Sequence, residues 1–448
     1  PKRAAIYLQD KLEFEGMIAN LGLRYDYSYA GGYWYSYDPF TSAFTGDQSL
    51  GIDTLLQHAP TKKISILSPR LGVSFPVTEN SKLFFNYGHF YSMPSPENLF
   101  LIRRYSDNNQ VVRLANPNNP LPKTVAYELG YEQNLFDEFL FHVAGYYKSV
   151  SDQARLTEYT SKDGKVDYFV STPTSYEDIR GFELSLTKNR GEWIAGFLNY
   201  TYQVSTTGGF GFVHVFQSNS DNLNYQNNRT NIENDLYQDK PVPRPYARAN
   251  VDFFTPTDFG PKAGGLNPLG DWRLSLLGDY RAGRYFTWAG GGTTSIQGLK
   301  NNVQYRDYYN VDLRLTKAFT IGPANIQVFM DVTNFLNIKT FSFGDNSSFG
   351  EYGFKDGNDF DAYMKSLHLP AEIGDKLQYG NVPGDDRPGD YREFDVAFAP
   401  VVSVPNLQNV SNITTTALYY DQSTGKYMKN VNSAWVQADQ SKVDQVLK

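Results

Sequence analysis

Hydrophobic and polar residues alternate with a period of two between Tyr308 and Asn337. The first arm, 309–316, reads YNVDLRLT, and the second arm, 326–333, reads IQVFMDVT. Successive side chains of a strand point to opposite faces, so this alternation predicts two β-strands. The connecting residues 320–325 are short and contain Gly-Pro, which predicts a turn that joins the arms into a hairpin.

This predicted hairpin differs from a soluble one in its length and in its polar face. Each arm has about ten residues, whereas strands of soluble sheets most often have about five or six. The polar positions include Asp312, Arg314 and Asp331. Strands of about 9–11 residues with one apolar and one charged face are typical of a transmembrane β-barrel, with lipid outside and water inside.

The same alternation recurs along the rest of the first 337 residues. Further strands are predicted within 3–12, 17–27, 68–93 (a hairpin), 127–132, 141–147, 182–187, 193–203, 248–253 and 271–280. The connections alternate between short and long, at about 4, 35, 5, 30, 4, 28, 3, 42, 14, 22 and 6 residues. The long ones include the expected loops 151–178 and 204–245. A membrane meander sorts its connections in this way, with tight periplasmic turns on one rim and long extracellular loops on the other.

We therefore predict an all-β fold, a transmembrane antiparallel β-barrel of which about twelve strands are present. A soluble or fibrous β-protein is the alternative, but loops longer than about 15 residues are uncommon in compact soluble domains. Residues 1–337 would form this partial barrel. The polar segment 338–448 would form one long extracellular loop region, with short helices near 360–369 and 441–447 and a short strand near 391–398.

Composition narrows the class of protein further. The 448 residues include 34 Tyr and 31 Phe, which suits the aromatic residues that membrane interfaces favour. There is no cysteine, which excludes disulfides and thiol chemistry. The net charge is −7 and the sequence shows no basic patch, so nucleic acid is not an expected partner.

Charged residues on the strands are expected to face the barrel lumen. Positive and negative residues are mixed in this set. Such a surface is expected to solvate the lumen and to hold a plug domain through polar contacts. The alternative is that these residues line a path for the substrate. The lumen-facing candidates are Arg24, Asp26, Arg70, Glu128, Glu183, Arg248, Asp252, Arg273, Asp312, Arg314 and Asp331.

Aromatic and basic residues in the long loops are the candidates for ligand contact. Aromatic rings stack on ligands, but they also pack loops together or lie in the outer aromatic girdle, and the sequence leaves these roles open. The candidates are Tyr33, Trp34, Tyr35, Arg103, Arg104, Tyr105, Phe210, Phe212 and Trp288.

No catalytic or metal site is predicted, and no cofactor. The sequence has no GxSxG, HExxH or P-loop motif, and its five histidines are scattered. The acidic stretch 356–361 lacks the spacing of an EF-hand, so a solvated turn is favoured over calcium binding.

The ordered series of hairpins resembles the TonB-dependent outer-membrane receptors, in particular the Oar-like group. The residues that carry the resemblance are AIYLQDK at 5–11, ANLGLRYD at 19–26, SPRLG at 68–72, FNYG at 85–88, AYELG at 126–130, GFEL at 181–184 and the strand 328–337. The resemblance implies a barrel of 22 strands, of which these would be strands 10 to 21. It also implies that the plug domain and the closing strand lie outside this chain, which would then be a fragment.

The function implied by the resemblance is energised uptake of an unidentified extracellular ligand. Its partners would be the outer-membrane lipid, a plug domain of the same parent chain and the TonB energising complex. The location would be the outer membrane of a Gram-negative bacterium. An adhesin whose long loops bind a surface, and a passive porin, are the alternatives.

Overall fold

The computed structural model describes residues 1–46, 51–106, 108–189, 191–211, 214–218, 241–263, 267–288, 290, 299–321, 323–339, 357–374, 377, 380–391 and 399–447. The chain forms two compact units, Pro1–Pro245 and Tyr246–Lys448. Among the described residues, no helix is long and apolar enough to cross a membrane.

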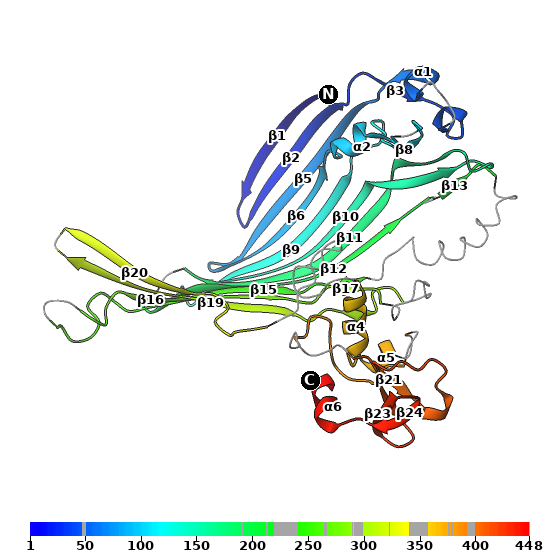
Figure 1. Cartoon of the computed structure of the whole chain (residues 1–448). Coiled ribbons are helices and arrows are strands. Elements are labelled where there is room, and N and C mark those ends of the chain that lie inside the picture. Colours follow the sequence, from blue (N-terminus) through cyan, green and yellow to red (C-terminus); the bar gives the residue numbers. More distant parts are fainter. Residues whose placement is uncertain are drawn as a thin grey trace. The chain divides into compact units, whose positions relative to one another are not determined.

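The first unit is built on one sheet of eight long antiparallel strands. Neighbours in the sheet follow the chain order (Figure 1). The strands are β1 (Lys2–Phe14), β2 (Met17–Tyr29), β5 (Lys63–Thr78), β6 (Ser81–Tyr91), β9 (Lys123–Leu135), β10 (Phe139–Thr160), β11 (Asp167–Lys188) and β12 (Ile194–Gly209).

Short and long connections lie at opposite ends of this sheet, as the loop lengths predict (Figure 1). The turn between β1 and β2 is only Glu15-Gly16, and Gly16 has φ +83°, a conformation that glycine adopts without steric cost. The long connections carry β3 (Tyr33–Ser36), η1 (Ser42–Phe44), α1 (Ile52–Leu55), β4 (Gln57–Pro60), α2 (Pro96–Phe100), β7 (Ile102–Arg104), β8 (Val111–Leu114), β13 (His214–Phe216) and β14 (Val242–Pro243).

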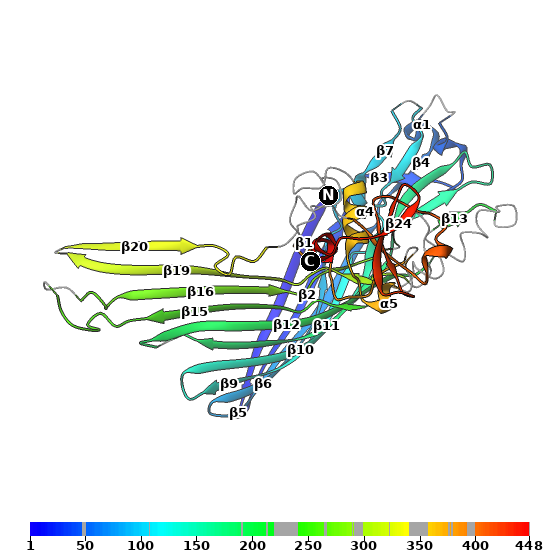
Figure 2. The same cartoon turned by 60° about the horizontal axis from the view of Figure 1, so that its bottom comes forward.

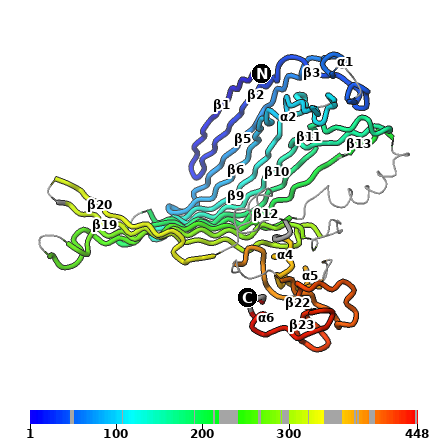
Figure 3. The backbone as a smooth tube through the Cα atoms, viewed as in Figure 1, coloured from blue at the N-terminus to red at the C-terminus, as the bar shows by residue number. Residues whose placement is uncertain are grey.

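The prediction of a loop over 151–178 is wrong. Strands β10 and β11 are 22 residues each and form one hairpin that continues through this segment to a turn at 161–166 (Figure 3). Bulges between Val150 and Arg155 mark the start of the outer part. This part lacks the strict apolar and polar alternation of the membrane strands, and its residues Val166, Tyr168 and Val170 are buried in an apolar cluster with the connections. A hydroxyl contact of 2.7 Å between Thr157 and Thr172 is one of its cross-strand contacts.

The outer hairpin gains new neighbours on both edges. β8 pairs in parallel with β11, and β13 pairs in parallel with β10. β8 belongs to the connection between β6 and β9, yet it pairs with β11. β13 belongs to the connection that follows β12, yet it pairs with β10. Each connection therefore pairs with the edge of the hairpin that lies farther from its own barrel strands. We call the outer part of β10 and β11, together with residues 33–46, 51–61, 95–106, 108–119 and 214–217, the cap.

The second unit contains four long antiparallel strands in chain order. They are β15 (Tyr246–Phe254), β16 (Trp272–Arg281), β19 (Tyr308–Ile321) and β20 (Ala324–Val332), and the short strands β17 (Tyr285–Phe286) and β18 (Val303–Gln304) lie between β16 and β19. The predicted hairpin over 308–337 is present as β19 and β20. Together with the first unit, the described residues contain the twelve long strands that the alternation predicts.

Helix α4 (Gly357–Ser366) packs at the end of these strands opposite the β19–β20 turn (Figure 2). Trp288 and Val303 form an apolar cluster with Tyr363, Met364 and residues around α5 (Ala371–Gly374). Reciprocal ion pairs support the contact. Arg306 Nη1 lies 3.5 Å from Asp390 Oδ1, and Arg387 Nη1 lies 3.5 Å from Asp307 Oδ1.

Residues 399–447 form a further small sheet and a helix within the second unit. The sheet contains β21 (Val401–Val404), β22 (Leu418–Asp421), β23 (Lys426–Val431) and β24 (Ala434–Gln437), with η2 (Leu407–Asn409) between β21 and β22. Helix α6 (Gln440–Leu447) packs on the sheet through Val443. Helices were predicted near 360–369 and 441–447 and are present, whereas the sheet was not predicted; the predicted strand at 391–398 lies almost wholly outside the described residues.

Candidate functional site

A groove of about 760 Å³ lies on the polar face of the first unit and crosses seven of its strands. Its charged lining consists of Arg70, Glu128, Lys148 and Glu183. Asn86 Nδ2 donates a hydrogen bond to Glu128 Oε2 at 3.1 Å. The groove is therefore lined with charges of both signs and with neutral amides, which is a surface that hydrogen-bonds readily to water or to protein.

The four long strands of the second unit carry a comparable groove of about 660 Å³. Arg314 and Asp331 are register partners on β19 and β20, and Arg314 Nε and Nη2 donate to the two oxygens of Asp331 at 2.5 and 2.7 Å. Arg273 Nη2 donates to Asp252 Oδ2 at 2.8 Å, and Ser275 Oγ donates to Asp252 Oδ1. Opposite charges facing each other across strands stabilise the sheet and leave the groove close to neutral.

All eleven lumen-facing candidates fall on the polar face of their unit. The strand register places Arg24, Arg70, Glu128 and Glu183 on the face opposite to Leu129 and Leu184. In the second unit the same holds for Asp312 and Arg314 against Leu313 and Leu315. The full set is Arg24, Asp26, Arg70, Glu128, Glu183, Arg248, Asp252, Arg273, Asp312, Arg314 and Asp331.

Four ion pairs involve seven of these residues, the partner of Arg248 being Asp279 from outside the set, and the sequence did not predict which residues pair. Besides the two pairs above, Arg24 binds Asp26 on its own strand at 2.8 Å, and Arg248 Nε lies 3.9 Å from Asp279. Lys148 and Tyr146 also line the first groove and were missed, although both alternate in phase with the polar positions of β10. Partner choice needs the register of neighbouring strands, which alternation within one strand does not contain.

The cap has its own hydrophobic core, assembled from three connections. Phe44 is fully buried and stacks on Tyr168, with ring centroids 4.3 Å apart and an interplanar angle of 20°. Tyr37 packs edge-on against Phe44 at 5.0 Å. Val111 and Leu114 of β8 complete the same cluster. Burial raises the pKa of both Tyr37 and Tyr168 well above the ordinary tyrosine value, so both hydroxyls are protonated at neutral pH.

A polar contact fixes one side of the cap. Asp53 accepts hydrogen bonds from the Tyr35 hydroxyl and from Arg104 Nη2, the latter at 2.7 Å. Burial and the contact with Asp53 raise the pKa of Tyr35 to about 12. The hydrogen bonds from Tyr35 and Arg104 lower the pKa of Asp53. Tyr35 and Arg104, two of the predicted ligand contacts, therefore already have partners within the protein.

A titratable cluster attaches β13 to the outer part of β10. His214 Nδ1 lies 3.3 Å from Glu158 Oε2, and Thr160 Oγ1 lies 2.8 Å from His214 Nε2. Burial, and then the neighbouring Asp167 carboxylate, raise the pKa of Glu158 to about 7. Burial lowers the pKa of His214. Near pH 7 Glu158 is thus about half protonated, whereas the neutral form of His214 is favoured.

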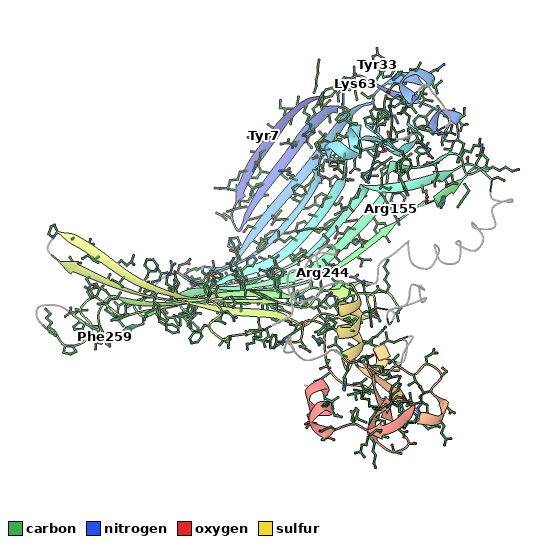
Figure 4. The ribbon with its side chains drawn as sticks, in the orientation of Figure 1. Tyr7, Tyr33, Lys63, Arg155, Arg244 and Phe259 are labelled. Atoms are coloured by element: carbon green, nitrogen blue, oxygen red, sulfur yellow. The ribbon has the colours of Figure 1, made fainter. Side chains whose placement is uncertain are left out.

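The other predicted ligand contacts differ in their exposure. Tyr33, Tyr105 and Phe210 are exposed; Tyr33 lies beside the outer loop elements of the first unit (Figure 4). Trp34 packs against the cap core. Trp288 is 7% exposed within the apolar cluster beside α4, so its side chain packs that loop. Phe212 lies outside the described residues.

The described residues contain no group of three or more His, Cys, Asp or Glu side chains that could hold a metal ion. The acidic stretch 356–361 begins outside the described part of the chain.

Comparison with known protein families settles the class of this fold. A model of the β-barrel of TonB-dependent receptor-like proteins matches residues 2–335, about three quarters of the chain. The chain belongs to the TonB-dependent receptor family. The family places it in the outer membrane of a Gram-negative bacterium, with the long antiparallel strands as a transmembrane β-barrel. The Oar-like subgroup, the count of 22 strands and the fragment assignment stay predictions.

Several solved structures are similar to this chain. They include the ferric-catecholate import receptor Fiu from K12 E. coli (16% identity, TM-score 0.43), which matches over 76% of this chain and 41% of its own. The outer membrane transporter YddB from Escherichia coli (14%, 0.49) matches over 75% and 41%. The Serratia marcescens hemophore receptor HasR (14%, 0.43) matches over 76% and 49%. The chain thus spans less than half the length of each. No curated protein matches it.

Proposed function

We propose that this chain forms part of the barrel of a receptor that takes up an extracellular ligand with energy supplied through the TonB complex. The observation that carries the proposal is the family match over residues 2–335, which covers all twelve long strands. In this proposal residues 1–337 form barrel and loops, and 338–448 form an extracellular region. The ligand is unidentified, and no enzymatic step is required of the barrel.

The two grooves support a role for the polar face in holding a plug domain. A barrel of the 22 strands that the resemblance implies would be an open channel without one. Two positive and two negative side chains line the first groove, and ion pairs of Arg273 with Asp252 and of Arg314 with Asp331 line the second, so both grooves are close to neutral. Such a surface exchanges contacts with a plug for contacts with water at little net cost, because a typical hydrogen bond contributes only about 0.5–1.5 kcal/mol net.

Uptake measurements in whole cells test the proposal. Cells that express the full-length parent protein are compared with a deletion strain, with and without a protonophore that collapses the inner-membrane proton gradient. Ligand uptake that disappears with the gradient, while surface binding remains, is the expected result. Uptake that is indifferent to the gradient would refute energised transport and favour a passive porin.

A second candidate function, surface adhesion, is favoured by one observation. Residues 399–447 contain a four-stranded sheet and a helix around an apolar cluster that also includes Val382, which is more structure than a solvated loop needs. Deleting 399–447 tests this candidate. An adhesin would lose attachment to cells or matrix, whereas a receptor with an accessory loop would keep attachment unchanged and show its defect in ligand uptake.

A further inference from the structure

Two arginines of the cap face each other across neighbouring strands. Arg103 on β7 and Arg113 on β8 are register partners in an antiparallel pair. Such side chains lie on one face, with Cβ atoms about 4.5–5.5 Å apart, and like charges placed this way repel each other. Among the described residues, neither guanidinium has a carboxylate partner in an ion pair. The repulsion is therefore uncompensated within this part of the chain.

The surroundings of Arg113 hold its guanidinium in place without neutralising it. Arg113 Nη2 donates to Asn98 Oδ1 at 3.2 Å, and the buried Ser171 hydroxyl donates to the same oxygen at 3.4 Å. Arg113 Nε is buried and has no acceptor among the described residues. This Nε is out of reach of solvent, so a soluble ligand would meet the terminal N–H groups of the guanidinium. Arg113 is thus half-buried and fixed, while Arg103 is exposed.

We propose that Arg103 and Arg113 form a binding site for the oxyanions of a small soluble ligand, namely its carboxylate or phosphate groups. A guanidinium presents a planar fork of N–H donors that matches both groups in a bidentate way. A bound oxyanion would neutralise the repulsion between the two side chains and supply acceptors to both. The site deepens the proposed receptor function, because it names the chemical class of the ligand.

The position of the pair favours a soluble ligand over a lipid headgroup. β8 pairs with β11 at Phe169. From Ser175, where β12 stops pairing with β11, to Phe169 there are six residues. At about 3.3 Å per residue this is roughly 20 Å along the strand beyond the last residue of β11 that pairs with β12. This distance favours a soluble ligand over a lipid phosphate.

Chemical modification of arginine tests the site without any transport measurement. Phenylglyoxal modifies accessible guanidinium groups, and peptide mass spectrometry reads the extent at each arginine. The full-length parent protein in detergent is modified in inorganic phosphate, in citrate and in chloride, all at the same ionic strength. We expect phosphate and citrate to protect Arg103 and Arg113 and chloride to protect neither. Equal protection by chloride would show screening alone and would overturn the proposal.

Substitutions distinguish a specific oxyanion site from a general effect of positive charge on the cap. Arg113→Gln should raise the phosphate concentration that half-protects Arg103 about tenfold or more, since a charge-assisted bidentate contact is lost. Arg103→Gln changes an exposed residue, so the cap should stay folded. In this variant the protection by phosphate is measured at Arg113. Lys165→Gln removes one exposed positive charge elsewhere on the cap and is the matched control. Protection that survives both arginine changes, or is lost equally in the control, would refute the site.

The outcome is independent of the uptake test. Protection by phosphate and citrate, together with uptake that ignores the proton gradient, would keep the oxyanion site and reject the energised receptor. Gradient-dependent uptake without protection would reject the site alone.

Discussion

Phe44→Ala should unfold the cap while the transmembrane strands stay intact. The Phe44 side chain is fully buried and contacts Tyr168 and Tyr37 through its ring. Removing a buried phenyl ring costs about 3–5 kcal/mol, which includes the cavity that it leaves. At about 1.4 kcal/mol per factor of ten, the equilibrium for opening the cap should shift by roughly 100-fold to several thousand-fold.

Hydrogen exchange measured by mass spectrometry is the appropriate assay, because it resolves opening by segment. In the variant, amides of β7, β8 and the outer hairpin 153–172 should exchange faster by this factor. Amides of the membrane part of β5 and β6 should be unchanged, since they share no core with Phe44. Tyr33→Ala, at a side chain that is 67% exposed, is the matched control and should change local stability by no more than about 0.5 kcal/mol.

Two results would refute this reasoning. Unchanged exchange in the cap would show that the stacked rings contribute little to its stability. Equal acceleration in the cap and in β5 would show that the cap and the barrel strands unfold together, and that the cap is not a separate cooperative unit.

Three further predictions concern the faces of the barrel and the titratable cluster. Leu313→Arg should lower the free energy of barrel unfolding by about 2–4 kcal/mol in lipid, measured by urea titration in vesicles. Arg314→Leu should cost less, and the reverse order would invert the two faces. The raised folded-state pKa of Glu158, about 7 against 4.5, gives stability that is present at low pH and is lost as pH rises through 7. Protease protection of 214–218 should therefore fall as pH rises from about 4.5 to 7, and Glu158→Gln should remove this fall. Protonation of His214 acts in the opposite direction, below pH 6.5.

The sequence by itself determined the strands, their faces and the ends at which long and short connections lie. Alternation with a period of two is a local property, and lipid on one side makes it strict, so β19 and β20 could be read from the chain. The polar positions of these strands were predictable for the same reason. Arg314 and Asp331 were both placed on the polar face without knowledge of their contact.

Only the tertiary structure decided which side chains meet and what the long connections form. The bidentate pair of Arg314 and Asp331 depends on the register between strands, and a shift of one residue would separate them. The cap strands β8 and β13 are three or four residues long and pair with strands distant in sequence, so no local pattern marks them. The fully buried Phe44 lies in a polar connection, and Trp288 resembled a ligand contact until its neighbours were known. Burial in loops is a property of the assembled connections, and hydrophobic periodicity within one segment does not contain it.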